Sequence, residues 1–166
     1  MLVLRDFEED EQLNTLFHNQ GFLKITMPES CILQNETWYT DEEFLATLSP
    51  RSKKHFLKEV LPFESSYDIV IKDKLTKVEL EHGYQLYKNV KNNNHAVNTF
   101  TYPIEIFQKM QDNPQWEFIL LYLNTSKTTE QDTNPLVGIL FCYKNLDHTY
   151  VPSLIGMDYT YVKEFQ

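Results

Sequence analysis

Apolar and polar residues alternate along several stretches of the chain, and this pattern predicts its strands. Residues 67–73 (YDIVIKD) alternate and are rich in β-branched side chains, which is typical of a strand with one buried face. Residues 116–124 (WEFILLYLN) are almost continuously apolar, which predicts a central strand covered on both faces. The other predicted strands are residues 2–7, 22–27, 31–35, 135–145 and 149–162. Pro152 cannot donate to a strand ladder and therefore predicts an edge position or a bulge in the last strand.

Helix signals separate these strands. The pairs Thr40 with Glu43 and Thr76 with Glu79 are capping boxes, each of which predicts a helix start. Ser49-Pro50 has serine where an N-cap belongs and proline at the first helical position. The predicted helices follow the acids at 8–11 up to Gly21, and otherwise span about 40–48, 49–62, 76–91 and 103–110. The order is β-α-β-β-α-α-β-α-α-β-β-β, which predicts a mixed α/β (α+β) domain whose residues 116–162 form an antiparallel meander.

The composition of the chain excludes or disfavours several classes of function. The 166 residues carry a net charge of −9, which disfavours nucleic-acid binding because phosphates require a basic surface. Only four glycines occur and no two are close together, which excludes a Walker A loop and a GxGxxG dinucleotide fingerprint. The longest uncharged apolar run, 118–123, is too short to span a bilayer, and the acidic N-terminal region is not a signal peptide. We therefore expect a cytoplasmic protein that is not in a membrane and holds Cys31 and Cys142 as buried thiols.

One basic cluster stands out in this acidic chain. It consists of Arg51, Lys53, Lys54, His55 and Lys58. Cations in the first turns of a helix face the positive end of its dipole, so this placement suggests an anion that binds there. Arg51, Lys53 and Lys54 are the candidate anion-binding residues. The alternative is that the acids at 41–43 neutralise a solvated basic surface.

Other catalytic signatures are weak. No histidine or cysteine spacing matches a metal site, and no GxSxG motif or family-specific cysteine context indicates a nucleophile. Asp158 is an acid in an otherwise apolar stretch, where burial would raise its pKa and suit it to general-base catalysis. The alternative is that Asp158 marks a bulge or the end of the strand. Aromatic residues gather in the last third of the chain, where they form either a ligand-binding surface or part of the core.

Several segments together resemble a known family. They are LSPRSKKHFLKEVLPFE (48–64), YQLYKNV (84–90), NTFTYP (98–103), WEFILLYL (116–123), VGILFCYKN (137–145) and YVPSLIGMDYTY (150–161). From about residue 36 onward the chain resembles acyl-CoA N-acyltransferase-like (GNAT-like) domains. It is most similar to bacterial GNAT domains related to the Fem-type aminoacyltransferases, some of which occur beside BioF-like, PLP-dependent enzymes.

The resemblance implies a largely antiparallel central sheet flanked by helices. Residues 67–166 would be the first half of one lobe, residues 1–35 the end of a preceding lobe, and residues 36–66 connecting helices. The chain is thus expected to be part of a larger polypeptide and to be inactive on its own. In this family a glycine-containing loop after the fourth strand holds the CoA pyrophosphate, and that loop would follow residue 166, so no residue here is assigned to the phosphates.

The implied activity is transfer of an acyl group from acyl-CoA, a substrate rather than a bound cofactor, to an amine. Tyr143, Asp158 and Tyr159 fall on the strands that flank the acyl group in the family and are the candidate catalytic residues; no metal is implied. The alternative is a non-catalytic accessory domain, appended to a PLP-dependent acyl-CoA condensing enzyme and docking through the basic cluster.

Overall fold

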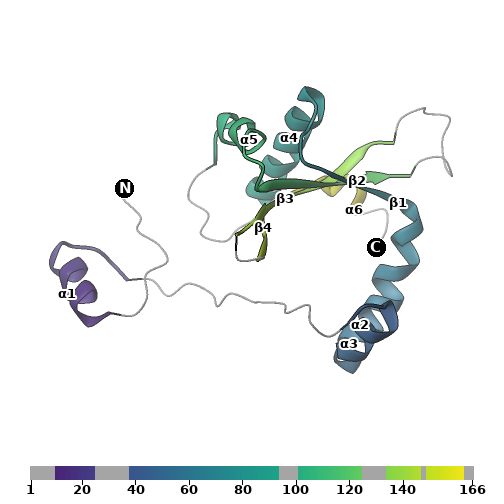
Figure 1. Ribbon diagram of the computed structural model, residues 1–166, viewed down its shortest axis with the longest axis horizontal. Helices are drawn as coiled ribbons and strands as arrows, with labels where there is room; N and C mark the ends of the chain where they lie inside the picture. The colour runs from purple at the N-terminus through teal and green to yellow at the C-terminus, as the bar shows by residue number, and fades with distance from the viewer. Residues whose placement is uncertain (1–9, 25–37, 94–100, 125–133, 147–148, 163–166) are drawn as a thin grey trace. The chain divides into compact units, whose positions relative to one another are not determined.

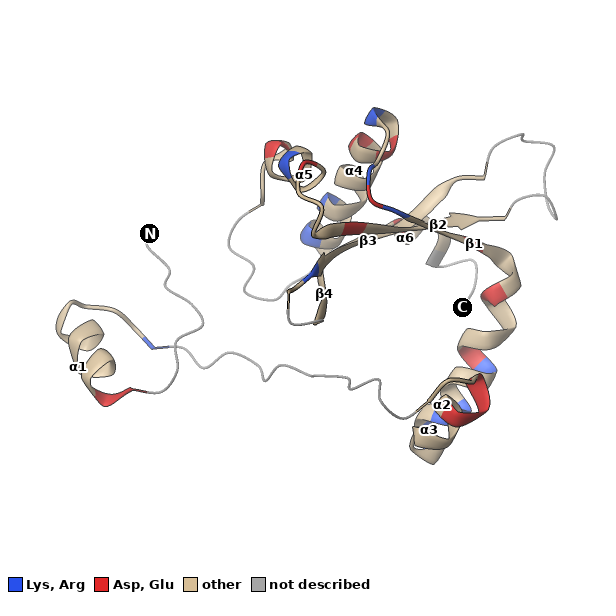
Figure 2. Cartoon of the chain, viewed as in Figure 1, with Lys and Arg blue, Asp and Glu red and all other residues tan. Residues whose placement is uncertain are grey.

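The computed structural model describes residues 10–24, 38–93, 101–124, 134–146 and 149–162. The chain divides into two compact units, Met1–Thr47 and Leu48–Gln166. Figure 1 shows the elements of each unit. Charged residues lie mainly on the helices and are sparse on the strands (Figure 2).

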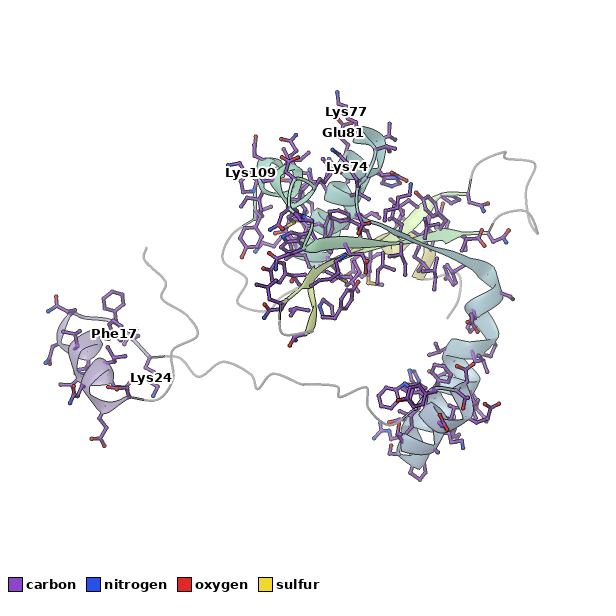
Figure 3. All side chains as sticks on the ribbon, viewed as in Figure 1. Phe17, Lys24, Lys74, Lys77, Glu81 and Lys109 are labelled. Atoms are coloured by element: carbon purple, nitrogen blue, oxygen red, sulfur yellow. The ribbon has the colours of Figure 1, made fainter. Side chains whose placement is uncertain are left out.

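The first unit contains two helices with the predicted ends. The helix α1 (Glu11–Asn19) is capped by Asp10, whose carboxylate accepts two backbone N–H bonds of 2.8 Å, and Gly21 follows its end with φ +81°. Phe17 of α1 packs edge-on against Phe22 (Figure 3). The helix α2 (Asp41–Thr47) begins at the Thr40–Glu43 capping box, with both reciprocal bonds at 3.2 Å. The predicted end of α1 at Gly21 and the predicted capping box of α2 are confirmed, whereas α1 begins only at Glu11, with Asp10 as its N-cap.

Most of the strands predicted before residue 36 lie outside the described residues. This holds for residues 2–7 and 31–35 in full, and for residues 25–27 of the predicted strand 22–27. Residues 22–24 are described, and they are not in a strand.

The second unit opens with a helical segment of changing pitch. The α-helix α3 (Pro50–His55) has Ser49 as N-cap, as predicted. It continues as the π-helix η1 (Phe56–Val60) and the 3-10 helix η2 (Leu61–Ser66), where the sequence predicted one regular helix. The Leu61 N–H donates to the Phe56 carbonyl five residues earlier, and Pro62 has no N–H with which to continue an α-helix. None of the residues in α3, η1 or η2 is buried.

Four strands form one antiparallel sheet in the order β1-β2-β3-β4. They are β1 (Tyr67–Lys72), β2 (Trp116–Leu123), β3 (Leu136–Lys144) and β4 (Tyr150–Met157), which confirms the predicted strand at 67–73 and the meander. The edge strand β4 carries Pro152, and the β3–β4 register shifts beside it, so the proline marks both an edge and an irregularity. The last strand ends at Met157 rather than at 162, because residues Tyr159–Val162 form the short helix α6.

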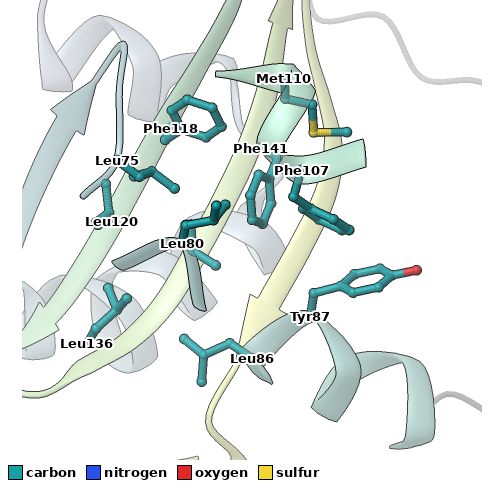
Figure 4. Close-up of a cluster of buried hydrophobic side chains, with 11 residues drawn as sticks. Leu75, Leu80, Leu86, Tyr87, Phe107, Met110, Phe118, Leu120, Leu136 and Phe141 are labelled. Carbon is teal, nitrogen blue, oxygen red and sulfur yellow. The ribbon is translucent and has the colours of Figure 1, made fainter. Parts of the chain in front are cut away.

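The core lies between one face of this sheet and two helices. These are α4 (Lys77–Asn93), which packs across β3 and β4, and α5 (Ile104–Met110) beside it (Figure 1). The buried cluster consists of Leu75, Leu80, Leu86, Tyr87, Phe107, Met110, Phe118, Leu120, Leu136, Ile139 and Phe141 (Figure 4). The described part of the chain is therefore a mixed α+β structure whose antiparallel sheet is flanked by helices.

The strand β2 is central, but its two faces differ. Phe118 and Leu120 are buried against the helices, whereas Ile119 and Leu121 keep partial exposure on the opposite face. The expectation that both faces are fully covered is thus not met among the described residues. The continuous apolar run instead arises because the second face is apolar but partly exposed; we call it the open face. Residue types alone do not distinguish such a face from a buried one.

Candidate functional site

A shallow hollow lies where the end of α4 meets the junction of β4 and α6. It has a volume of about 370 Å³ and is lined by Asn89, Asn92, Asn93, Asp158, Tyr159 and Thr160. Two of the three predicted catalytic residues therefore line one hollow. The asparagines lie at the C-terminal end of α4.

Backbone and side-chain bonds fix the position of Asp158. Its N–H donates to the Val137 carbonyl at 2.9 Å, which extends the contact between β3 and β4 past the last strand residue. Its carboxylate accepts hydrogen bonds from the backbone N–H and the hydroxyl of Thr160, at 3.0 and 2.6 Å. Asp158 thus stands at the strand end, which was the structural alternative for this residue, and it orients the first turn of α6.

The helix α4 reaches this junction through Asn89. The side-chain amide of Asn89 donates to the Met157 carbonyl at 3.3 Å. Gly156 makes the close approach feasible, because a Cβ at this position would lie 2.7 Å from the Tyr87 backbone nitrogen and 2.8 Å from the Leu86 Cβ. The hollow is therefore built on a direct contact between a helix and a strand, with a carboxylate and three amide side chains on its walls.

Tyr143 lies at the other end of the same strand pair. It is opposite Val151 and packs against Trp116, with the ring centroids 5.4 Å apart. Met157, next to Asp158, pairs with Gly138, and Tyr143 lies five residue steps further along β3, a distance of about 17 Å. The three predicted catalytic residues therefore do not form one cluster, and Tyr143 does not line the hollow.

The basic cluster lies on α3, a helix of less than two turns, except for Lys58, which lies on η1. Arg51, Lys53 and Lys54 are all exposed on α3. His55 pairs with Glu59 at 2.9 Å, and the N–H of Ser52 is already bonded to the Ser49 side chain. The acids at 41–43 belong to the first unit, so both anion binding and neutralisation by these acids stay predictions.

Sequence reasoning missed a polar cluster on the helix-covered face. Glu79, at the start of α4, accepts hydrogen bonds from Lys72 of β1 and from the Tyr122 hydroxyl of β2. Burial raises the Glu79 pKa, but the donors Lys72, Thr76 and Tyr122 outweigh it and lower the pKa to about 2. Burial, together with Glu79, raises the pKa of Tyr122 to about 12. The Thr76–Glu79 capping box was visible in the sequence, whereas the two partners from the strands were not.

A second cluster missed by the sequence lies on the open face. The Tyr150 hydroxyl donates to Glu117 at 2.6 Å, and Lys144 lies within 3.4 Å of both Glu117 and Asp73. Burial, with Cys142 and Glu117, raises the pKa of Tyr150. Burial also raises the pKa of the fully buried Cys142, which keeps it a thiol rather than a nucleophilic thiolate. The expectation of a buried thiol is confirmed for Cys142, and Cys31 lies outside the described residues.

Within the described ranges, no group of three His, Cys, Asp or Glu side chains could hold a metal ion. No helix in the same ranges has the length and apolar character needed to cross a membrane. A scan against models of known protein families finds no match to the chain, and a search of curated proteins finds none either.

Proposed function

We propose that the chain is an acyltransferase-type, GNAT-like domain that transfers an acyl group from an acyl-CoA or similar donor to an amine. One observation carries the proposal: residues 67–157 run β1-α4-α5-β2-β3-β4, and the four strands are antiparallel in chain order. This is the order that the resemblance implies for the first half of such a domain. The hollow at the end of β4 is then the candidate acyl-transfer site.

The proposed chemistry needs a base and an oriented carbonyl. The amine nitrogen attacks the thioester carbonyl carbon, the C–S bond breaks, and the thiolate leaves. The ammonium proton formed in the attack passes to the Asp158 carboxylate, directly or through one water. Asp158 is suited to this role because its two bonds to Thr160 fix its orientation. Tyr159, on the same wall, would donate its hydroxyl to the developing oxyanion.

The proposal predicts that acetyl-CoA binds at the hollow with micromolar affinity. Calorimetric titration gives the affinity, and amide chemical shifts of a ¹⁵N-labelled chain locate the binding. We expect shifts at Asn89, Asp158 and Thr160. In the larger polypeptide that the resemblance implies, Asp158→Asn should keep the binding and remove acyl transfer to an amine, whereas Tyr143→Phe, at the other end of the strand pair, should change neither. Absence of heat and of shifts at millimolar acetyl-CoA would exclude this function.

A second candidate function is an accessory domain that docks onto a larger enzyme. The observation that favours it is the helical segment 50–66, which has no buried residue and exposes Leu57, Val60 and Leu61 beside its basic cluster. This reading predicts no binding of acetyl-CoA or CoA, so the same titration separates the two functions.

A further inference from the structure

The strand β1 has one open edge. Among the described residues it pairs with β2 alone, and its exposed residues include Ile69 and Ile71, with exposed fractions of 62% and 60%. The helix α4 packs across β3 and β4, the two strands farthest from this edge in the strand order. An unprotected edge of β-branched residues is a template for a further strand, and natural proteins normally block such an edge or pair it.

The sequence of β1 complements itself. Around Val70 it runs Asp-Ile-Val-Ile-Lys over residues 68–72. In an antiparallel pair of two copies centred on Val70, Asp68 stands opposite Lys72 of the partner subunit, and Ile69 stands opposite Ile71 of the partner subunit. Opposite charges and β-branched pairs are the cross-strand neighbours that stabilise a sheet. Because the axis is two-fold, each favourable pair occurs twice.

Both faces of the sheet agree with this register. Ile69 and Ile71 lie opposite Leu121 and Ile119 of β2, on the open face. Asp68, Val70 and Lys72 alternate onto the helix-covered face. A register shifted by one residue would place the isoleucines of one subunit on the charged face of the other. A register shifted by two residues would place Ile69 opposite either Asp73 or Ile69 of the partner subunit, and the ion pairs between Asp68 and Lys72 would be lost.

The charged residues are accessible to a second strand. Asp68 is exposed and accepts one bond from Asn134 at 3.0 Å, which leaves lone pairs for a further donor. One-third of the Lys72 side chain is exposed, and its ammonium group has three N–H donors, of which Glu79 needs one. The ion pair between subunits therefore adds to the existing contacts rather than replacing them.

We propose that β1 is a homodimer interface, through which two copies of the chain form one continuous eight-stranded antiparallel sheet. Assembly stops at two copies because the other edge is blocked. Pro152 of β4 has no N–H, and the register beside it is irregular, so β4 does not accept a strand. The inference does not depend on acyl transfer and stands or falls by oligomeric state.

The experiment is sedimentation equilibrium of the full chain and of two matched double variants. The wild-type mass should rise from 19.8 kDa toward twice that value with increasing concentration, with a dissociation constant on the order of 10 μM, as expected for a small interface. Ile69→Lys/Ile71→Lys places like charges opposite each other and should weaken the dimer about thirtyfold. Ile69→Glu/Ile71→Lys removes the same isoleucines but places opposite charges across the axis, so it should stay within about fivefold of wild type.

The pair of variants tests both the edge and the register. In either register shifted by two residues, the Glu/Lys variant sets like charges against each other and loses the dimer. Circular dichroism melts should show all three proteins folded, because both isoleucines are mostly exposed. A wild-type chain that stays monomeric, or two variants that behave alike, would overturn the proposal.

Discussion

Replacing Glu79 with glutamine is expected to lower the free energy of unfolding by up to about 3 kcal/mol at pH 7. Glu79 has only 14% of its side chain exposed, and it joins three elements: its own helix α4, Lys72 of β1 and Tyr122 of β2. One of its oxygens also accepts the Thr76 N–H at 2.8 Å and so completes the N-cap of α4. Glutamine keeps the size of the side chain but loses its charge, so the Lys72 ammonium group is left without its anion.

The pH dependence identifies the charge as the cause. The Glu79 pKa falls from 4.5 to about 2 on folding, so the folded state favours the ionised form. The stability that this shift contributes is complete above about pH 5. It declines as the pH falls through 4.5 toward 2, where the carboxylate of the folded protein is also protonated. Urea unfolding at pH 7, 4 and 2.5 should therefore show the difference between wild type and Glu79→Gln shrinking as the pH decreases.

Glu81→Gln is the matched control for this experiment. Glu81 lies two residues further along α4 and pairs with Lys77 at 3.9 Å, with exposed side-chain fractions of 58% and 88% (Figure 3). Exposed pairs of this kind contribute about 0–0.5 kcal/mol. Equal costs for the two substitutions, or a Glu79→Gln cost that stays constant with pH, would show that the partly buried Lys72–Glu79 ion pair does not hold α4 against the sheet.

The contrast between Thr76 and Tyr122 shows how far the sequence can predict such a cluster. The capping box of Thr76 and Glu79 is local, so its spacing alone predicts the helix start. Tyr122 is 43 residues from Glu79, and the two meet only because the start of α4 packs on the face of the sheet that carries Tyr122. That packing depends on the fit of many side chains at once and cannot be deduced from either element alone.

The candidate site divides in the same way. Asp158 and Tyr159 are neighbours in sequence and share one hollow, whereas Tyr143 lies at the far end of β3. A hairpin argument would have separated them: Tyr143 is close to the turn between β3 and β4, and Asp158 is at the end remote from that turn. In an antiparallel pair, such residues cannot be opposite each other. The asparagines of α4 could not be placed beside Asp158, because helix-to-sheet packing has no comparable rule of register.

The second large effect is expected at Gly156. An alanine Cβ there would lie 2.7 Å from the Tyr87 backbone nitrogen, 2.8 Å from the Leu86 Cβ and 2.9 Å from the Ile139 Cγ2. The contacting atoms of Tyr87 and Leu86 belong to the backbone of α4 or are bonded directly to it. Because these atoms cannot rotate aside, the whole helix must move away from β4. We expect Gly156→Ala to cost about 3 kcal/mol, at the upper end for overpacking, and to lower the melting temperature by roughly 10 °C.

Gly83→Ala is the control, because Gly83 lies on α4 and faces the sheet in the same helix–sheet contact. Its Cβ would lie 2.9 Å from the Cδ1 of Ile139, the far end of a side chain that can change rotamer, and in ordinary contact with the Ile139 Cγ2 and Phe141 Cζ at 3.6 and 3.7 Å. Alanine also gains about 1 kcal/mol over glycine inside a helix, so we expect a net change within about 1 kcal/mol. Thermal unfolding of the two variants compares the contacts directly. A Gly156→Ala protein as stable as wild type would mean that α4 does not lie this close to β4, and the hollow beside Asn89 and Asp158, which depends on that contact, would lose its support as well.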